Sequence, residues 1–252
     1  MMNAVCKAWA TRMNSSRVSL HPAFVLHSRP YRDTSLLLDI FTEQHGRIAA
    51  IARGAKQPRS KFNGILQPFT GLLVSWSGTG DLVTLTAAEQ AQRTGKLQGN
   101  AMLAAFYLNE LLIQLMQRHD PHPELYKNYR ISLSELSEGK NNELTLRRFE
   151  CYLLQEIGYG LILDHDVESG EPVQPDRYYC YHPEHGPVIT DGDAQESRPL
   201  VVQGKTLLAL QSGAIEARDV FLEAKHFMRA IIHHQLGGRP IKTRELKLNK
   251  VL

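Results

Sequence analysis

The chain has 252 residues, of which 42% are hydrophobic, and its formal net charge at neutral pH is only +3. This length suits one large domain or two ordinary ones with a real core, and the small charge excludes a general polycation. Three widely separated cysteines (Cys6, Cys151 and Cys180) exclude a disulfide framework and favour a reducing cytosol. No apolar run reaches membrane-spanning length. Residues 1–21 carry basic side chains but no continuous apolar core, so we expect a flexible leader rather than a secretory signal.

Five short β-type runs follow between residues 22 and 92, separated by turn-forming residues. They are Phe24–Leu26, Ser35–Phe41, Arg47–Ala52, Leu72–Trp76 and Leu82–Thr86. Strands at this spacing are typical of a small Greek-key barrel. The spacing alone permits either an OB-fold or an SH3-like barrel.

The segment Gly46–Phe69 holds five cationic side chains and no carboxylate. The cations are Arg47, Arg53, Lys56, Arg59 and Lys61. A small sheet with a loop of one charge sign is suited to bind a polyanion, and a phosphate backbone is the commonest one. A solvated basic loop that only keeps the protein soluble explains the same charges.

Aromatic side chains that stack against bases would complete a site for single strands. The candidates are Tyr31, Phe62, Phe69 and Trp76. Each of them fits a packing role at the core or rim of the barrel at least as well, because aromatic residues mostly serve by burial.

Helical periodicity begins near Gly95 and dominates the rest of the chain. The expected helices are Ala101–Met116, Glu124–Leu136, Leu146–Ile157, Gly204–Gln211 and Arg218–Gln235. We expect the first three to pack as a bundle and the last, which is the most strongly amphipathic, to form the spine of the second domain. Residues 161–203 are rich in acidic residues, proline and glycine, and predict an irregular insertion in which Tyr178–Tyr181 is the only strand-like piece.

The insertion contains a few residues of the types that bind metals. They are His165, Cys180, His182 and His185. Their spacing is poor for a tetrahedral zinc site and the chain has no CxxC pair, so we expect neither a metal nor a cofactor. The nearby carboxylates are explained by a solvated acidic surface and do not indicate a metal site. No nucleotide-binding or hydrolase motif occurs, and we therefore expect no enzymatic activity.

Two adjacent arginines, Arg147 and Arg148, precede Phe149 in an expected helix. They lie about 100° apart around the helix axis, so Phe149 can face the core while at least one guanidinium reaches solvent. An exposed arginine at the rim of an apolar groove suits a peptide that ends in an apolar residue with a free carboxylate. An ordinary ion pair to Glu143 or Glu150 explains the arginines equally well.

A second basic segment lies near the C-terminal end of the sequence. Its candidate nucleic-acid contacts are Arg239, Lys242 and Arg244, with Glu245 as the nearby acidic residue. We expect these cations to support binding of a phosphate backbone.

The stretch AFVLHSRPYRDTSLLLDIFTEQHGRIAAIARGAK, followed by GILQPFTGLLVSW, resembles the N-terminal domain of the RecO family. The resemblance continues through LNELL, DPHPELY, LRRFE, GYG and GGRPIKTREL, and covers about Pro22–Leu246. It implies an α+β protein in which an OB-fold β-barrel at residues 22–92 precedes an α-helical domain at residues 96–252. Many members of the family bind zinc in the insertion through two CxxC pairs, which this sequence lacks.

The resemblance further implies a mediator of recombinational DNA repair that binds single- and double-stranded DNA and anneals complementary strands without ATP. The implied partners are RecR, the acidic C-terminal tail of the single-stranded-DNA-binding protein SSB, and indirectly RecA, which is loaded onto the DNA. Arg147, Arg148 and Phe149 are then the expected contacts of the SSB tail. The expected location is the cytoplasm, in association with the nucleoid. An RNA-binding OB module and a protein-interaction adaptor remain alternatives.

Overall fold

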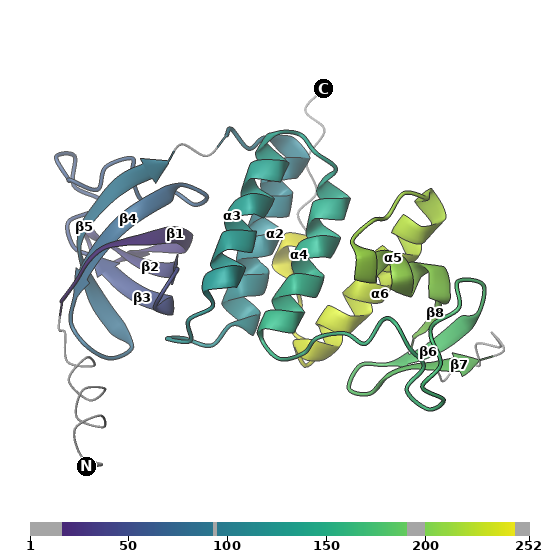
Figure 1. Cartoon of the computed structure of the whole chain (residues 1–252). Coiled ribbons are helices and arrows are strands. Elements are labelled where there is room, and N and C mark those ends of the chain that lie inside the picture. The colour runs from purple at the N-terminus through teal and green to yellow at the C-terminus, as the bar shows by residue number, and fades with distance from the viewer. Residues whose placement is uncertain (1–16, 93–94, 191–199, 245–252) are drawn as a thin grey trace, which may run out of the picture. The chain divides into compact units, whose positions relative to one another are not determined.

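The computed structural model describes residues 17–92, 95–190 and 200–244. Within these ranges the chain divides into two compact units (Figure 1). The first unit comprises residues 17–92 and 117–126, and the second comprises residues 95–116, 127–190 and 200–244. The second unit is mainly helical, so that the chain has the predicted α+β class.

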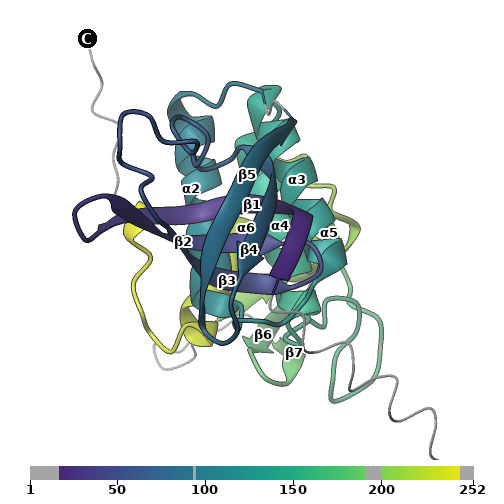
Figure 2. The ribbon, with the colours of Figure 1, turned by 90° about the vertical axis from the view of Figure 1, so that its left-hand side faces the viewer.

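The first unit is a closed barrel in the strand order β1-β2-β3-β5-β4. Its strands are β1 (Arg17–Tyr31), β2 (Ser35–Thr42), β3 (Gly46–Ala52), β4 (Gly71–Ser77) and β5 (Leu82–Gln92). Neighbouring strands pair in antiparallel fashion except β3 and β5, which are parallel. Figure 2 shows the barrel from the side on which its strands face the viewer. This five-stranded Greek-key arrangement confirms the predicted OB-fold.

The long strand β1 closes the barrel because it pairs with two partners. Its first part, from Arg17 to Phe24, pairs with β4, and its second part, from Ala23 to Tyr31, pairs with β2. Register shifts after Val18 and after Val25 bend the strand between the two pairings. Because β1 begins at Arg17, its first residues lie inside residues 1–21, for which the sequence predicted a flexible leader.

The barrel core follows the period-2 alternation of the strands. Buried members include Val25, Leu38, Ile40, Ile48, Leu72, Val74, Val83 and Leu85. Alternate side chains of a strand point to the same face, so these residues all face the barrel interior. Apolar runs in the sequence thus determine which face of each strand is buried.

The segment 117–126 also belongs to the barrel unit, although it lies among helical residues in the sequence. The N–H of His119 donates to the carbonyl of Arg47 at 3.0 Å, and the Tyr126 ring contacts the rings of Phe24 and Phe41. Gly46 has φ +63°, and a Cβ atom there would lie 2.1 Å from the carbonyl oxygen of Asp120. Only glycine fits this close approach.

The helical unit contains the expected helices within a few residues of their predicted limits. They are α2 (Gly99–Leu115), α3 (Pro123–Ser137), α4 (Asn142–Glu156), α5 (Gly204–Ser212) and α6 (Arg218–Gln235), followed by the 3-10 turn η1 (Lys242–Arg244). The first turn of α3 belongs to the barrel unit and the remainder to the helical unit. The Tyr129 ring of α3 contacts Phe149 of α4, and its hydroxyl donates to Asn109 of α2 at 2.5 Å.

The insertion is more regular than the sequence predicted. It contains β6 (Tyr178–His182), β7 (Gly186–Thr190) and β8 (Val201–Gln203), which form an antiparallel sheet in the order β7-β6-β8. Tyr179, Tyr181 and Val202 join the core formed around α6, where the Tyr181 and Phe227 rings meet edge to face. Strands of three to five residues are short for an alternation pattern, and a sheet of this size depends on packing against a core that includes residues of α5 and α6.

Across the described ranges, every helix is too short or too polar to cross a lipid bilayer.

Candidate functional site

The segment that joins β3 to β4, called here the cationic loop (residues 53–69), is anchored to the barrel by apolar side chains. Phe62 and Leu66 belong to the barrel core, and Ala55 and Ile65 pack against it. Consecutive turns are closed by backbone hydrogen bonds, among them Ser60 N–H to the Gln57 carbonyl at 3.0 Å. The backbone of the loop is therefore held in place while its polar side chains face outward.

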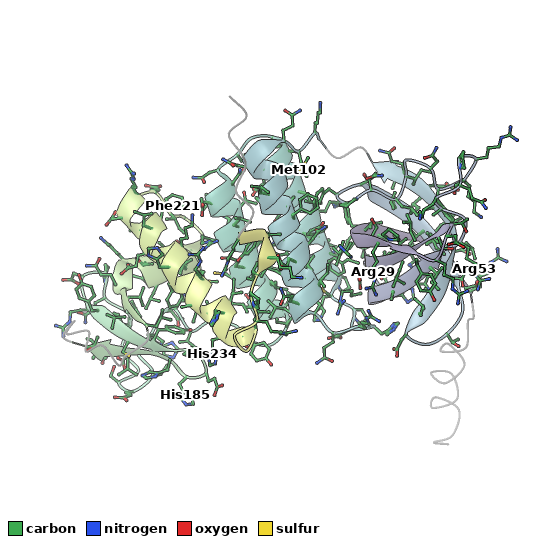
Figure 3. The ribbon with its side chains drawn as sticks, turned by 180° about the vertical axis from the view of Figure 1, so that it is seen from behind. Arg29, Arg53, Met102, His185, Phe221 and His234 are labelled. Atoms are coloured by element: carbon green, nitrogen blue, oxygen red, sulfur yellow. The ribbon has the colours of Figure 1, made fainter. Side chains whose placement is uncertain are left out.

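Three of the predicted cations in this loop are exposed and unneutralised. Arg53, Lys56 and Arg59 face solvent, and none has an ion pair among the residues that the structure describes. Figure 3 shows Arg53 at the outer edge of the barrel. The Lys61 ammonium is also exposed, but it donates to the Thr86 carbonyl at 2.6 Å. The loop thus presents a fixed surface of positive charge.

Arg47 differs from the other predicted cations because it is largely buried. Its side chain is 12% exposed and its Nη1 donates to the Asp39 carboxylate at 3.2 Å. Burial lowers the pKa of Arg47 against the opposing effect of Asp39. Arg118, from the segment 117–126, lies 3.7 Å from the same carboxylate and is more exposed. Arg47 is therefore held inside the barrel by an ion pair with Asp39, a carboxylate that it shares with Arg118.

Sequence reasoning missed a cation beside the loop. Arg32 is exposed in the turn after β1, with its guanidinium 5.4 Å from the centroid of the Tyr31 ring. The N–H of Lys56 donates to the carbonyl of Thr34 at 2.9 Å, which ties the cationic loop to this turn. The sequence does contain a sign of this cation, the closely spaced Arg29 and Arg32. The pair was not joined to the loop because it precedes the loop by more than twenty residues.

Most of the candidate stacking residues lie in the core. Phe62 is 3% exposed, and Phe69 and Trp76 are also buried. Tyr31 is half-buried beside Arg32. The half-buried Tyr31 ring has surface on which a base can stack. Phe62 has no such surface, because its ring lies in the barrel core and anchors the loop.

The helical unit contains a separate cationic site, called here the anion pocket, of about 460 Å³. Residues of α2, α4, α6 and η1 line it. Its cations are Arg147, Lys225, Arg229 and Arg244, and its apolar wall includes Leu103, Ala104 and Leu146. Glu143, the carboxylate in its lining, pairs with the Lys225 ammonium at 2.7 Å. A cavity with an apolar wall and several cations in its lining suits an apolar side chain attached to an anion.

A buried network supports this pocket. Glu150 is fully buried, and its Oε1 accepts from the Tyr107 hydroxyl at 2.6 Å and from Arg147 Nη2 at 2.8 Å. Arg244 Nη2 donates to the Tyr107 hydroxyl at 2.8 Å. Burial raises the pKa of Glu150, an effect that Arg147 opposes, and burial likewise raises the pKa of Tyr107.

Arg147 is 5% exposed, and its Nε has no hydrogen-bond partner among the described residues. A buried donor without a partner costs free energy, and an acceptor that enters the pocket would relieve that cost. The structure therefore gives Arg147 both the helix ion pair with Glu150 and a place in the pocket lining.

The other two predicted peptide contacts lie elsewhere. Arg148 is partly exposed, but its Nε donates to the carbonyl of Gly213 at 2.8 Å and it does not line the pocket. Phe149 is fully buried and packs against Tyr129. Only Arg147 of the predicted trio faces the pocket.

The predicted cations of the second basic segment belong to the helical unit. The Arg239 guanidinium donates to the carbonyl of Leu236 at 3.0 Å, and Lys242 is exposed. The N–H groups of Lys242 and Thr243 donate to the Glu110 carboxylate of α2 at 2.7 and 2.8 Å. These bonds attach η1 to α2 and bring Arg244 over the Tyr107 ring, at 5.3 Å from its centroid.

No three histidine, cysteine or carboxylate side chains gather into a metal-binding group within residues 17–92, 95–190 and 200–244. His165 pairs with Asp164, and Cys180 is buried in the small sheet. The buried Asp166 accepts N–H groups of Glu168, Ser169 and Ile189, and so stabilises its own turn and joins it to β7.

Comparison with known proteins assigns both units to one family. The family model "Recombination protein O N terminal" matches residues 17–93, and "Recombination protein O C terminal" matches residues 97–245. The chain belongs to the RecO family. The RecO match thus includes the cationic loop, the anion pocket and the strand β1 from its first described residue.

Several relatives named "DNA repair protein RecO" align over nearly the full length of both chains. The protein of Methylococcus capsulatus is 48% identical over 235 residues, which cover 93% of this chain and 95% of the relative. That of Nitrosospira multiformis is 45% identical over 234 residues, or 93% and 96% of the two chains. That of Coxiella burnetii is 44% identical over 232 residues, or 92% and 99%.

Proposed function

We propose that this RecO-family protein is a mediator of recombinational DNA repair that holds DNA on its barrel through the cationic loop. The observation that carries the proposal is the group formed by Arg53, Lys56 and Arg59, exposed and unneutralised on an anchored loop. Such cations replace the counterions of a phosphate backbone without reading its sequence, and they act on single and double strands alike. The names of the relatives support a role in DNA repair.

Annealing without ATP follows from the same charges. When two strands are neutralised on one protein, their mutual repulsion falls, and complementary bases can pair. The exposed Arg32 beside the loop adds to this neutralisation, and Tyr31 offers the accessible ring for a base. The second basic segment, with Arg239 and Lys242, is a further contact for the phosphate backbone.

The anion pocket is proposed as the binding site for the C-terminal residue of the SSB tail. The apolar wall at Leu103 and Leu146 suits an apolar terminal side chain, and Arg147, Arg229 and Arg244 suit its carboxylate. Occupation of this pocket would loosen SSB from the DNA. The proposed continuation, in which RecR joins the complex and RecA is loaded, rests on membership of the RecO family.

The DNA proposal is tested by the triple variant Arg53→Ala, Lys56→Ala, Arg59→Ala. Loss of three phosphate contacts should weaken binding at every sequence and reduce the slope of log affinity against log salt by about 2 for single strands. Fluorescence anisotropy over a salt series measures both, and a strand-annealing assay with and without SSB measures the consequence. Arg218→Ala, an exposed arginine at the start of α6, is the control.

Two outcomes would favour the alternatives. Unchanged DNA binding in the triple variant would make the loop incidental and favour a protein-interaction adaptor. Tighter binding to an RNA strand of matched sequence than to DNA would favour an RNA-binding module.

The peptide proposal is tested separately at the rim of the pocket, because Arg147 also neutralises the buried Glu150. Arg229→Ala removes an exposed cation and should weaken binding of an SSB-tail peptide while leaving binding of naked DNA intact. Isothermal titration with the peptide provides the measurement. An unchanged isotherm would remove the pocket from the proposal.

A further inference from the structure

The helical unit contains a further cavity, called here the α4–α5 cavity, with a volume of about 380 Å³. It lies where the C-terminal ends of α4 and α5 meet the chain segment 160–164 that follows α4. Helix α4 contributes Cys151 and Gln155 to its lining, and α5 contributes Leu210 and Gln211. The two helices are neighbours in the unit (Figure 1). A cavity of this volume is large enough for a ligand, since ligand pockets measure about 300–1,000 Å³.

This cavity is separate from the anion pocket, and the two have no described lining residue in common. Arg147, Cys151 and Gln155 are spaced at i, i+4 and i+8 and therefore share one face of α4. Arg147 lines the anion pocket, whereas Gln155 lines the α4–α5 cavity about 12 Å further along the helix. The buried Met228 of α6 contacts this face at Cys151, with 3.9 Å between the two sulfur atoms.

The α4–α5 cavity has the opposite charge to the anion pocket. Its lining includes the exposed carboxylate of Asp164, and none of its described lining residues is a lysine, arginine or histidine. The Nδ1 atom of His165 lies 2.8 Å from this carboxylate, and their hydrogen bond lowers the pKa of Asp164. Burial raises the pKa of Cys151 to about 12, so its thiol is neutral. At neutral pH the lining therefore carries a negative charge.

Two helix C-termini add to this negative potential. Gln155 and Gln211 are each the last residue but one of their helix. The last carbonyl groups of a helix carry a partial negative charge, and a cation nearby is stabilised by it. Neither α4 nor α5 has a basic residue in its last turn. Arg148 donates to the carbonyl of Gly213 just beyond α5, but its side chain does not line the cavity.

The cavity also combines an apolar floor with polar groups at its rim. Leu163 and Leu210 are buried at the floor. Gln155 and Gln211 are exposed, and neither side chain has a hydrogen bond to another residue that the structure describes. Their amide oxygens can therefore accept hydrogen bonds from a ligand that enters beside Asp164.

We propose that the α4–α5 cavity binds an alkyl guanidinium or ammonium group, as carried by an arginine or lysine side chain of a partner protein. The cation is paired by Asp164 and donates to the amide oxygens of Gln155 and Gln211. Its aliphatic stem covers Leu163 and Leu210, as the stems of such side chains do on apolar surface. This inference goes beyond the proposed function and does not depend on it.

An organic cation suits this cavity better than a metal ion or a nucleic acid. A hard metal ion needs six or more oxygen ligands, whereas no metal-binding group of three occurs in the described ranges. An apolar floor would also contribute nothing to a metal ion. Phosphates are repelled by Asp164 and by the two helix C-termini.

The experiment titrates three small probes into the full-length protein. They are N-acetyl-arginine amide, its uncharged analogue N-acetyl-citrulline amide, and the polyamine spermidine. NMR chemical-shift titration measures each affinity, and the shifts should appear at backbone amides of residues 160–164 and 210–213. The arginine probe should bind about fivefold more tightly than the citrulline probe, as one partly exposed ion pair provides. Added salt should reduce this ratio.

Two variants test the assignment of the charges. Asp164→Asn keeps the shape of the side chain and should reduce the affinity for the arginine probe to that for citrulline. Gln155→Lys places a cation in the cavity and should weaken the arginine probe more than about tenfold. Their matched controls are Asp176→Asn and Gln174→Lys, at exposed positions of the same unit outside the cavity, and both should leave the affinity unchanged. DNA affinity should be unchanged in Asp164→Asn.

The outcomes are distinguishable. Equal affinities for the arginine and citrulline probes, or an unchanged arginine affinity in Asp164→Asn, would overturn the inference. Tighter binding of spermidine than of the arginine probe, lost in Asp164→Asn, would confirm a cation site but assign it to free polyamines. None of these results bears on the cationic loop or the anion pocket, because the α4–α5 cavity has no lining residue of either.

Discussion

The cationic loop and the anion pocket carry charge of the same sign but handle it in opposite ways. In the loop, Arg53, Lys56 and Arg59 face solvent and have no balancing carboxylate in the described part of the chain. In the pocket, Arg147 is buried and shares Glu150 with Tyr107. Exposed cations are screened by salt and attract any polyanion, whereas buried donors with fixed geometry select the shape of their ligand. Burial therefore distinguishes Arg147 from the cations of the loop, and we expect the loop to bind polyanions generally and the pocket to be selective.

The difference between the loop and the pocket predicts the largest change in the free energy of unfolding for a substitution of Arg147. Arg147→Ala leaves the carboxylate of Glu150 buried without its cation, and should lower the free energy of unfolding by about 3–5 kcal/mol. Arg53→Ala on the exposed loop should change it by about 0.5 kcal/mol or less. Urea denaturation measures both. The double variant Arg147→Met, Glu150→Leu should recover most of the loss because no buried charge remains. A loss of similar size in both single variants would erase the distinction between the two regions.

Phe62 provides the next test, because it decides whether the loop is anchored or reads bases. Phe62→Ala should lower the free energy of unfolding by about 3–5 kcal/mol through the cavity it leaves in the barrel core. Phe62→Leu, which keeps most of the packing, should cost roughly 1.5 kcal/mol or less and retain DNA affinity. Thermal denaturation and anisotropy with a single strand measure the two quantities. A loss of 1–3 kcal/mol of binding energy in the leucine variant would instead match a stacked base.

A substitution of Arg32 should have a smaller effect, on the salt dependence of DNA binding, and tests whether this residue belongs to the same binding surface as the loop. Arg32→Ala should reduce the salt slope of single-strand binding by about 0.7, since one phosphate contact is lost. Arg47→Ala should leave that slope nearly unchanged, because Arg47 already pairs with Asp39. The same anisotropy titrations separate the two. Equal changes in both variants would place Arg47 on the DNA surface despite its burial.

The smallest expected effect is a pH dependence of the barrel at the cluster of His21, His45 and Trp76. Burial, with His21 as a second cause, lowers the pKa of His45 from its ordinary value of 6.5. The unfolded chain therefore binds more protons than the folded one as the pH falls below that value. Barrel stability should be complete above about pH 6.5 and decline below it, as unfolding titrations at several pH values would detect. His45→Gln should flatten this decline, and a decline of the same size in that variant would exclude His45 as its origin.

Much of the architecture follows from local patterns. Alternating apolar residues predicted the strands of the barrel, and the stripe from Val220 to Ile232 predicted α6, because side-chain periodicity reports which face is buried. The composition of Gly46–Phe69 likewise located the cationic loop. The strands β7 and β8 escaped prediction because β7 begins with Gly186 and Pro187, which are typical of turns, and β8 has only three residues.

The anion pocket was decided by tertiary structure alone. Arg244 and Tyr107 are 137 positions apart in the chain, and they meet because hydrogen bonds, among them those of Glu110, attach η1 to α2. Sequence reasoning singled out Arg147 and Arg148 as a pair, but packing directs one into the pocket and the other toward Gly213. Local pattern determines the charge and secondary structure of a segment, because these depend on neighbouring residues. Burial and the meeting of distant side chains depend on how the segments pack, and that information lies in the fold.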